Sequence, residues 1–209
     1  MTSSSSVRIV DITKTRAYEK QLYKCLAPMP FRRYANRQRY LDTALTKGFH
    51  KNLLIVNGEV VGSIEYAPAE ASGYPITGKG TVVMNCVWIL RKMKGHSFGR
   101  LLVDRMVKTE TAAVGFATIA LENHWSPWFR KSQMEKLGFK ALDSIAVSHR
   151  AKRPDQVFRV FLMWMPRTTN AQPPMWNKQK LLEGETFCLA HPLYRPHWWK
   201  GKILEHRTA

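Results

Sequence analysis

Glycine, serine and basic residues gather in one short segment, "KGHSFG" (94–99), which separates an apolar run from a helix-like stretch. The run "TVVMNCVWIL" (81–90) is typical of a buried strand, and the residues after the segment have the apolar spacing of a helix. A strand–turn–helix connection leaves backbone N–H groups unpaired at the start of the helix, where the helix dipole adds partial positive charge. Gly95 and Gly99 have no side chain, so an anion can come close to the main chain there. The segment therefore predicts a phosphate or pyrophosphate site.

A simpler interpretation of the same segment is a tight connection between two elements, for which glycine is a common residue. The segment has neither the P-loop spacing G-x-x-x-x-G-K-[ST] nor the dinucleotide-binding spacing G-x-G-x-x-G. Lys94, His96 and Arg100 add cations or donors beside the turn, which favours an anion. We expect the apolar side of the following helix to pack on a sheet. Its members are Phe98, Leu101, Leu102 and Met106.

Strands and helices that could position this segment follow one another along residues 7–165. "NLLIVNGEVVGSIEY" (52–66) contains Asn57-Gly58 between two strand-like runs, which predicts a hairpin with a two-residue type I′ turn. Other strands are expected at 7–14, 81–90, 116–123, 139–148 and 157–165, and helices at 16–26, 33–47, 128–138 and from the quoted segment to about 113. The order predicts an α/β domain, residues 1–168, with helices on both faces of its sheet. Residues 169–209 form a Pro- and Trp-rich extension, which we expect to pack on that domain.

Composition excludes several classes of protein. The hydrophobic content of 44% is that of a folded chain. The net charge of +18 lies mainly in residues 1–168 and either attracts polyanions such as nucleotides, RNA or acidic proteins, or only keeps the surface soluble. Three scattered cysteines argue against a disulfide framework. "MTSSSSVR" lacks the apolar middle of a signal peptide and no run could span a membrane, so we expect a cytoplasmic protein without membrane partners. Two histidines and one cysteine in "CLAHPLYRPH" (188–197) fall short of a structural zinc site, and no metal is expected.

The quoted segment resembles the acetyl-CoA pyrophosphate loop, [QR]-x-x-G-x-[GA], of the GCN5-related N-acetyltransferase (GNAT) family. Lys94 stands where Gln or Arg is usual, Ser97 replaces the first motif glycine, and Gly99 holds the last position. The hairpin is similar to the one before the cofactor strand of that family, and "LENHWSPWFRKSQMEKLGFKAL" is similar to its strand–Asn–helix–"KLGF" segment. The resemblance covers residues 7–165. It implies a GNAT-type mixed, mostly antiparallel sheet, splayed at its central strands, with helices on both faces. Three segments, "NCVWIL", the lengthened helix "HWSPWFRKSQM" and "AQPPMW", also resemble an uncharacterised subgroup with a YoaP-like C-terminal extension.

The same resemblance implies acetyl-CoA as the acyl donor and assigns its contacts. The main chain of Val87, Trp88 and Ile89 would pair with the pantetheine arm, and Asn123 matches an asparagine that touches the cofactor. Met134 stands where the family often has a tyrosine that protonates the departing thiolate, so the general acid is left open, with water as the alternative. The pyrophosphate would meet the backbone N–H groups of Lys94, Gly95, His96, Ser97, Phe98, Gly99 and Arg100.

Acyl transfer to an amine also needs a proton acceptor and a donor to the oxyanion. A backbone N–H near Ile89 is the implied oxyanion donor. Glu65 on the hairpin, and Glu122 or His124 at the end of the next strand, are the candidate bases; we favour Glu65 and His124. Each also has an ordinary interpretation, as an outward-facing strand carboxylate or a histidine bound to the backbone. Cys86 would allow an acyl-enzyme, but a cysteine inside an apolar strand is more often a small buried hydrophobe.

We therefore predict an N-acyltransferase that moves an acetyl group from acetyl-CoA to an amine by direct attack in a ternary complex, acting as a monomer or homodimer. The basic body favours an acceptor associated with nucleic acid, such as aminoacyl-tRNA or a protein bound to RNA. Two alternatives stay open. One is a small-molecule amine acetylase, and the other is a catalytically degenerate acyl-CoA- or RNA-binding module.

Overall fold

The structure is a computed structural model that describes residues 6–24, 35–125, 128–149, 153–183 and 204–207. Its strands are β1 (Val7–Asp11), β2 (His50–Val56), β3 (Glu59–Pro68), β4 (Ile76–Thr77), β5 (Thr81–Ile89), β6 (Gly115–Glu122), β7 (Lys140–His149), β8 (Val157–Pro166), β9 (Met175–Trp176) and β10 (Leu204–His206). Its helices are α1 (Glu19–Leu22), α2 (Ala35–Ala44), α3 (Phe98–Thr109), α4 (Lys131–Lys136) and α5 (Lys178–Glu183). The helices expected at 16–26 and 128–138 are therefore shorter than predicted.

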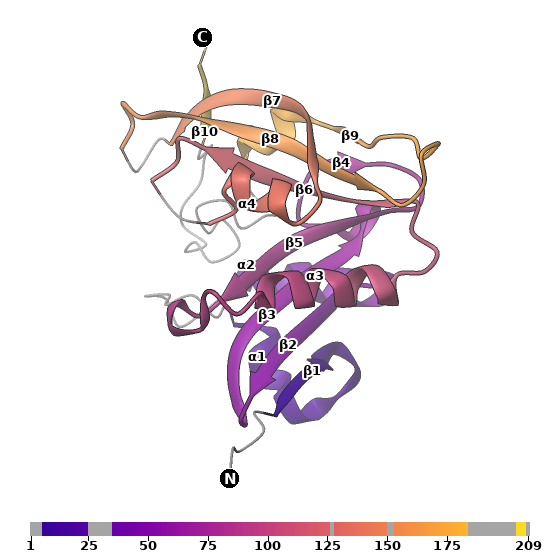
Figure 1. The fold of residues 1–209 in the computed structure, drawn as a ribbon. Coiled ribbons are helices and arrows are strands. Elements are labelled where there is room, and N and C mark those ends of the chain that lie inside the picture. The colour runs from indigo at the N-terminus through magenta and orange to yellow at the C-terminus, as the bar shows by residue number, and fades with distance from the viewer. Residues whose placement is uncertain (1–5, 25–34, 126–127, 150–152, 184–203, 208–209) are drawn as a thin grey trace.

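Eight of these strands form one sheet in the order β1-β2-β3-β5-β6-β8-β7-β10 (Figure 1). Only β5 and β6 pair in parallel within it, and every other neighbouring pair is antiparallel. Consecutive strands joined by short connections form antiparallel pairs easily, whereas β5 and β6 are joined through α3. The mixed, mostly antiparallel sheet predicted from the sequence is confirmed.

The hairpin of β2 and β3 turns at the two residues expected. Asn57 has φ 50° and Gly58 has φ 82°, and a type I′ turn needs positive φ at both central residues. His50 pairs with Tyr66 at the open end of the hairpin, and the register shifts by one residue between Leu54 and Ile55, where Val61 of β3 is an extra residue.

β5 and β6 pair over a short distance and then part. Their parallel register covers only Thr81 with Gly115 through Val83 with Ala117, although both strands continue beyond it. The register between β5 and β3 shifts between Glu65 and Tyr66, so that a residue of β5 is left without a partner. The splay expected between the central strands is thus present, and Figure 1 shows the two ribbons diverging above α3.

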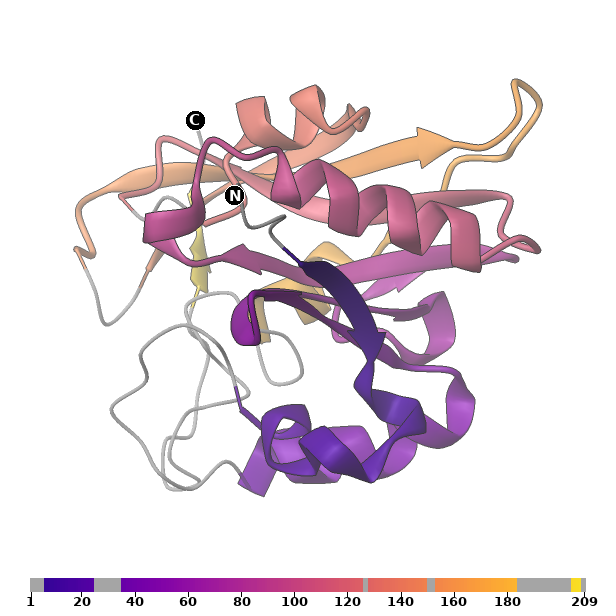
Figure 2. The same ribbon diagram turned by 60° about the horizontal axis from the view of Figure 1, so that its bottom comes forward.

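Helices cover both faces of the sheet, as Figure 2 shows with α3 and α4 on one side and α1 and α2 on the other. Leu102, Val103 and Met106 of α3 are buried in the larger apolar cluster. Leu22 and Leu41 belong to a second cluster under α1 and α2. The expectation that Leu101 packs on the sheet was wrong, because it is 40% exposed at the outer side of the first turn of α3.

The extension after residue 168 contains elements that the sequence did not predict. β9 pairs with β4, and β10 adds an eighth strand by pairing with β7. Trp176 Nε1 donates to Asp143 Oδ2 at 2.8 Å, and Lys178 Nζ lies 2.8 Å from the same oxygen. Cys188, Trp198 and the other residues of 184–203 lie outside the described residues. Among the residues that are described, no helix is long and apolar enough to cross a membrane.

Candidate functional site

The connection between β5 and α3 is a turn with two left-handed residues. Gly95 has φ 92°, a conformation that glycine adopts at little cost. Ser97, at φ 56°, is the residue before α3, and its side chain makes no capping hydrogen bond to the helix. A left-handed serine is strained, and such strain persists where the surrounding structure enforces it. The turn thus holds the first backbone N–H groups of α3 without using its own side chains to satisfy them.

Those N–H groups are free to bind an anion. Leu101 N–H is the first of α3 to donate within the helix, to the carbonyl oxygen of Ser97 at 3.1 Å. In the described part of the chain, the N–H groups of residues 95–100 donate to no backbone or side-chain acceptor. An added Cβ at Gly99 would meet no atom within 4 Å, so open space lies directly against the main chain. Among the described residues, six backbone donors around the start of α3 are therefore unpaired, and the space beside Gly99 is open.

A cavity of about 780 Å³ lies beside this turn. Its floor is apolar, with Phe98, Trp128 and Met134 among the side chains that line it. The charged residues that line it within the described part of the chain are basic: Arg91, Lys94 and Lys136. An apolar cavity with cations at one end suits a ligand that has an extended arm and an anionic head.

The splayed strand contributes main-chain groups to the same cavity, which Val87, Trp88 and Ile89 line. Leu90 N–H donates to the carbonyl oxygen of Val61 in β3 at 2.8 Å. Because successive residues of a strand direct their N–H groups to opposite edges, those of Ile89 and Val87 point away from β3, toward the gap. The main-chain N–H groups of these two residues therefore lie on the edge of β5 that has no pairing with β6.

Arg100 and His96 contribute less to the cavity than their positions in the sequence suggested. The guanidinium of Arg100 donates to the carbonyl oxygens of Lys136 and Leu137, which ties the start of α3 to the end of α4. The His96 ring stacks on Phe98 with 5.5 Å between ring centroids, and it does not line the cavity. Arg100 thus joins two walls of the cavity through its side chain.

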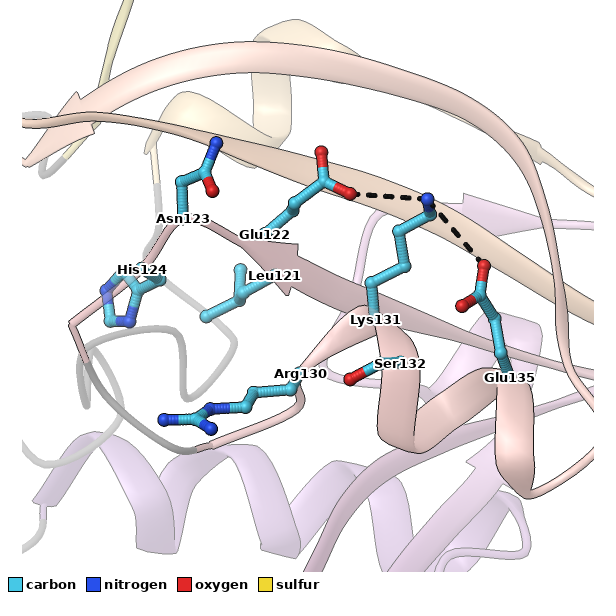
Figure 3. Close-up of a pocket in the computed structure, with 8 residues that line it drawn as sticks. All are labelled: Leu121, Glu122, Asn123, His124, Arg130, Lys131, Ser132 and Glu135. Carbon is cyan, nitrogen blue, oxygen red and sulfur yellow. Dashed lines mark hydrogen bonds and ion pairs between the residues drawn. The ribbon is translucent and has the colours of Figure 1, made fainter.

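A second, smaller pocket of about 300 Å³ lies between the end of β6 and the start of α4 (Figure 3). It is lined by Asn123 and His124 but by none of the residues of the turn. Lys131 Nζ lies 3.3 Å from Glu122 Oε1 and 3.6 Å from Glu135 Oε1. The Lys131 ammonium group therefore forms ion pairs with both carboxylates, as the dashed lines in Figure 3 show.

Asn123 and His124 are held at the rim of this second pocket. Asn123 has φ 61° and is exposed, and its carbonyl oxygen accepts from Gln156 Nε2 at 2.8 Å. The His124 ring stacks on Trp125 at 3.9 Å between ring centroids and meets Phe158 edge-on at 4.6 Å. The structure thus does not bring either residue into the wall of the larger cavity.

Glu65 belongs to a buried cluster of charges under α2. Its Oε1 lies 2.7 Å from Arg37 Nη2 and 2.9 Å from Lys51 Nζ. Burial alone would raise the pKa of Glu65, but the charges of Arg37 and Lys51 outweigh it and hold the pKa below its usual value. A carboxylate in this setting is a weak proton acceptor, so the geometry favours an ion-pair role, and the assignment of Glu65 as a base stays a prediction.

Comparison with solved structures identifies the fold. A protein assigned as a GNAT-family acetyltransferase from Desulfovibrio desulfuricans matches with a TM-score of 0.54 at 12% identity, over 77% of this chain and 99% of that one. The chain has the GNAT fold. The Bacillus subtilis acetyltransferase in complex with CoA matches with a TM-score of 0.52 at 14% identity, over 78% of this chain and 100% of that one. The ribosomal-protein-S18-alanine N-acetyltransferase from Escherichia coli also gives 0.52, at 10% identity over 81% and 100% of the two chains. No family model and no curated protein matches the sequence.

In this GNAT fold, several residues that line the larger cavity were not predicted from the sequence. Trp128, Phe129 and Gln133 come from the segment before and within α4 and line the cavity opposite β5. Their signal in the sequence was the aromatic pair "WF", which we interpreted only as the start of a helix. Met134 is 2% exposed and lines the same wall, so it offers packing where a proton donor was sought.

Proposed function

We propose that this protein is an N-acetyltransferase that takes its acetyl group from acetyl-CoA. The observation that carries the proposal is the row of unsatisfied backbone N–H groups at residues 95–100, at the mouth of a cavity bordered by a splayed strand. Backbone donors at a helix N-terminus bind phosphate without further help. The CoA-bound Bacillus subtilis protein shares the fold, which supports the same ligand here.

The residues present fit the diphosphate and the pantetheine arm of coenzyme A. The N–H groups of residues 95–100 would hold the diphosphate, with the cations of Arg91, Lys94 and Lys136 near the negatively charged head. The exposed main-chain edge at Val87 and Ile89 would pair with the amides of the pantetheine arm, as a neighbouring strand would. Bound in this way, acetyl-CoA supplies an activated acyl group, and the protein's part is to bind and aim it.

Transfer is proposed to be direct, with the acceptor amine and acetyl-CoA bound together. Cys86 is 8% exposed inside β5, as expected for a small buried hydrophobe. His124 remains the proposed proton acceptor, because imidazole is the commonest general base in enzymes and His124 lies just beyond β6, the strand that parts from β5. Glu65 is the weaker choice for this role because of its ion pairs.

The proposed acceptor is an amine associated with nucleic acid. The net charge of +18 creates a field that concentrates polyanions near the surface, and acylation of a tRNA-linked or RNA-bound protein amine would use it. The second candidate is a binding module that holds acyl-CoA or RNA without turnover. Met134 supports it, because the side chain offers no proton to a leaving thiolate.

The division of the chain is part of the proposal. Residues 1–168 would form the catalytic domain, and 169–209 an extension packed on it. The pairing of β10 with β7 and the contacts of Trp176 and Lys178 with Asp143 support this arrangement. β10 pairs with residues 147–149 of β7, so the extension covers a part of the β7 edge that would otherwise present unpaired backbone groups.

Thiol release from acetyl-CoA tests the proposed activity. The full chain is incubated with acetyl-CoA together with one acceptor at a time: a polyamine, a peptide amine pool or charged tRNA. Free CoA is followed with a thiol reagent. The proposal expects release that depends on one of the amines and exceeds the rate with water alone. CoA binding without thiol release in the presence of any amine pool would favour the binding module. A separate measurement of tRNA retention at increasing salt tests the acceptor, because retention that is insensitive to salt would exclude a nucleic-acid-associated acceptor.

A further inference from the structure

The point at which β5 and β6 part is built from side-chain hydrogen bonds. The last parallel pair is Val83 with Ala117. One residue further, the carbonyl oxygen of Met84 accepts a hydrogen bond from Thr118 Oγ1 at 2.8 Å, and Thr118 is fully buried. A side chain of β6 thus replaces a main-chain donor at the first position where the ladder would have continued. The gap between the strands therefore begins at a defined residue pair.

Asn85 is the residue of β5 that has no partner in β3. Glu65 pairs with Cys86 and Tyr66 pairs with Met84, so Asn85 forms a β-bulge between them. A bulge leaves main-chain groups outside the ladder, and here the Tyr74 hydroxyl donates to the carbonyl oxygen of Asn85 at 2.8 Å. The oxygen that the bulge would have left unpaired is satisfied from a neighbouring loop.

The side chain of Asn85 connects the bulge to α2, which lies on the face of the sheet opposite α3. Its Nδ2 donates to the Tyr40 hydroxyl of α2 at 2.6 Å, and its Oδ1 accepts from Gly73 N–H at 3.1 Å. The Tyr40 hydroxyl in turn donates to the carbonyl oxygen of Ala71 at 2.9 Å. Asn85 is only 7% exposed, so these bonds form where water does not compete and where their loss is costly.

We propose that Asn85 is a positioning residue that, with Tyr40, Tyr74 and Thr118, fixes the place where the strands part and so sets where the acyl end of the donor lies. The inference rests on the proposed function. The bulge lies four residues before Ile89, about 13 Å along the strand, whereas the anion-binding turn lies beyond the other end of that stretch. The cluster therefore acts on the pantetheine and acyl end of acetyl-CoA and leaves the diphosphate site untouched.

Two ligands distinguish an effect at the acyl end of the donor from an effect at the diphosphate site. In the proposed pose, acetyl-CoA would extend from the turn along β5 toward the bulge, whereas 3′-phospho-ADP, the head of coenzyme A without its arm, would occupy only the turn. Affinities for both are measured by calorimetry on the full chain and on Tyr74→Phe and Asn85→Leu. Because Asn85→Leu leaves several buried partners unsatisfied, Tyr74→Phe, which removes a single hydroxyl, is the primary variant. We expect acetyl-CoA affinity to fall at least tenfold in both variants, with 3′-phospho-ADP affinity unchanged.

Thr81→Val is the matched control, because Thr81 lies buried in the same strand and its Oγ1 has no partner among the described residues. This variant should bind both ligands as the unaltered chain does. A loss of folding stability in Tyr74→Phe with unchanged affinity for both ligands, or an equal loss for both, would overturn the positioning role. If the unaltered chain bound neither ligand, the proposed function itself would fail, and this inference with it.

Discussion

Substitution of Gly99 by glutamate should raise the stability of the protein while removing its affinity for coenzyme A. Gly99 lies in the first turn of α3, and the space around its Cα is empty of protein atoms within 4 Å of an added Cβ. A glutamate therefore meets no steric obstacle in the folded chain. The carboxylate would, however, extend into the space that we assign to the diphosphate.

The two effects have opposite signs and can be sized. Replacing a helical glycine by a better helix former stabilises by about 0.5–1 kcal/mol. A negative charge in the first turn of a helix adds about 0.3–1 kcal/mol, so we expect the free energy of unfolding to rise by about 1 kcal/mol. In contrast, a carboxylate about 5 Å from one phosphate charge costs roughly 3 kcal/mol at an effective dielectric constant of 20. That cost lowers affinity by more than about 100-fold.

Urea denaturation measures the first effect, and calorimetric titration with coenzyme A measures the second. Gly99→Gln is the matched control, because it has the same shape without the charge, and its affinity should exceed that of Gly99→Glu. If the free energy of unfolding were lower in Gly99→Glu than in the unaltered chain, the space beside Gly99 would not be free. Unchanged affinity would place the diphosphate elsewhere.

Three further substitutions test the framework around the site by urea denaturation. Glu65→Gln should lower the free energy of unfolding by about 3–5 kcal/mol, because it leaves two buried cations without their carboxylate. Gly115→Ala should cost about 1–3 kcal/mol, because the new Cβ would lie 2.3 Å from Trp164 Cη2. Asp11→Asn should cost about 1 kcal/mol at pH 7, because Asp11 Oδ2 lies 2.7 Å from His50 Nδ1.

The Asp11 prediction has a definite dependence on pH. Burial raises the pKa of Asp11, but hydrogen bonds from His50 and Thr13 outweigh burial and lower it below 3.8. A carboxylate whose pKa is lowered by folding stabilises the protein above its unfolded pKa and loses that effect as the pH falls through the folded value. The difference between Asp11→Asn and the unaltered chain should therefore be constant near neutrality and shrink below about pH 4. A constant difference down to pH 2.5 would contradict the assigned hydrogen bond between Asp11 and His50. Little loss of stability in Glu65→Gln would contradict the buried ion pairs of Glu65, and little loss in Gly115→Ala would contradict the close packing of Gly115 on Trp164.

Local signals in the sequence were enough to predict much of the fold. Asn57-Gly58 predicted the hairpin, because few dipeptides accept positive φ at both positions. Gly95 and Gly99 predicted a turn at which an anion could approach α3, and the structure leaves open space beside both. These features depend on residues that are adjacent in the chain.

Features that depend on distant residues were not predictable in this way. The β10 strand pairs Leu204 with His149, and nothing within a three-residue strand indicates its partner. Asn85 lies in an apolar run that looks like an uninterrupted strand, and its bulge is visible only against β3. Glu65 looks like an outward-facing strand carboxylate until α2 brings Arg37 to it. Asn123 lines the smaller pocket beside the start of α4, and its expected contact with the cofactor stays a prediction.

A structure of the protein crystallised with coenzyme A tests the central claim most directly. The account predicts diphosphate oxygens within hydrogen-bonding distance of the backbone nitrogens of residues 95–100, and a pantetheine arm along Val87 and Ile89 in the gap between β5 and β6. Coenzyme A bound at another surface, or a gap closed by pairing of β5 with β6, would contradict it.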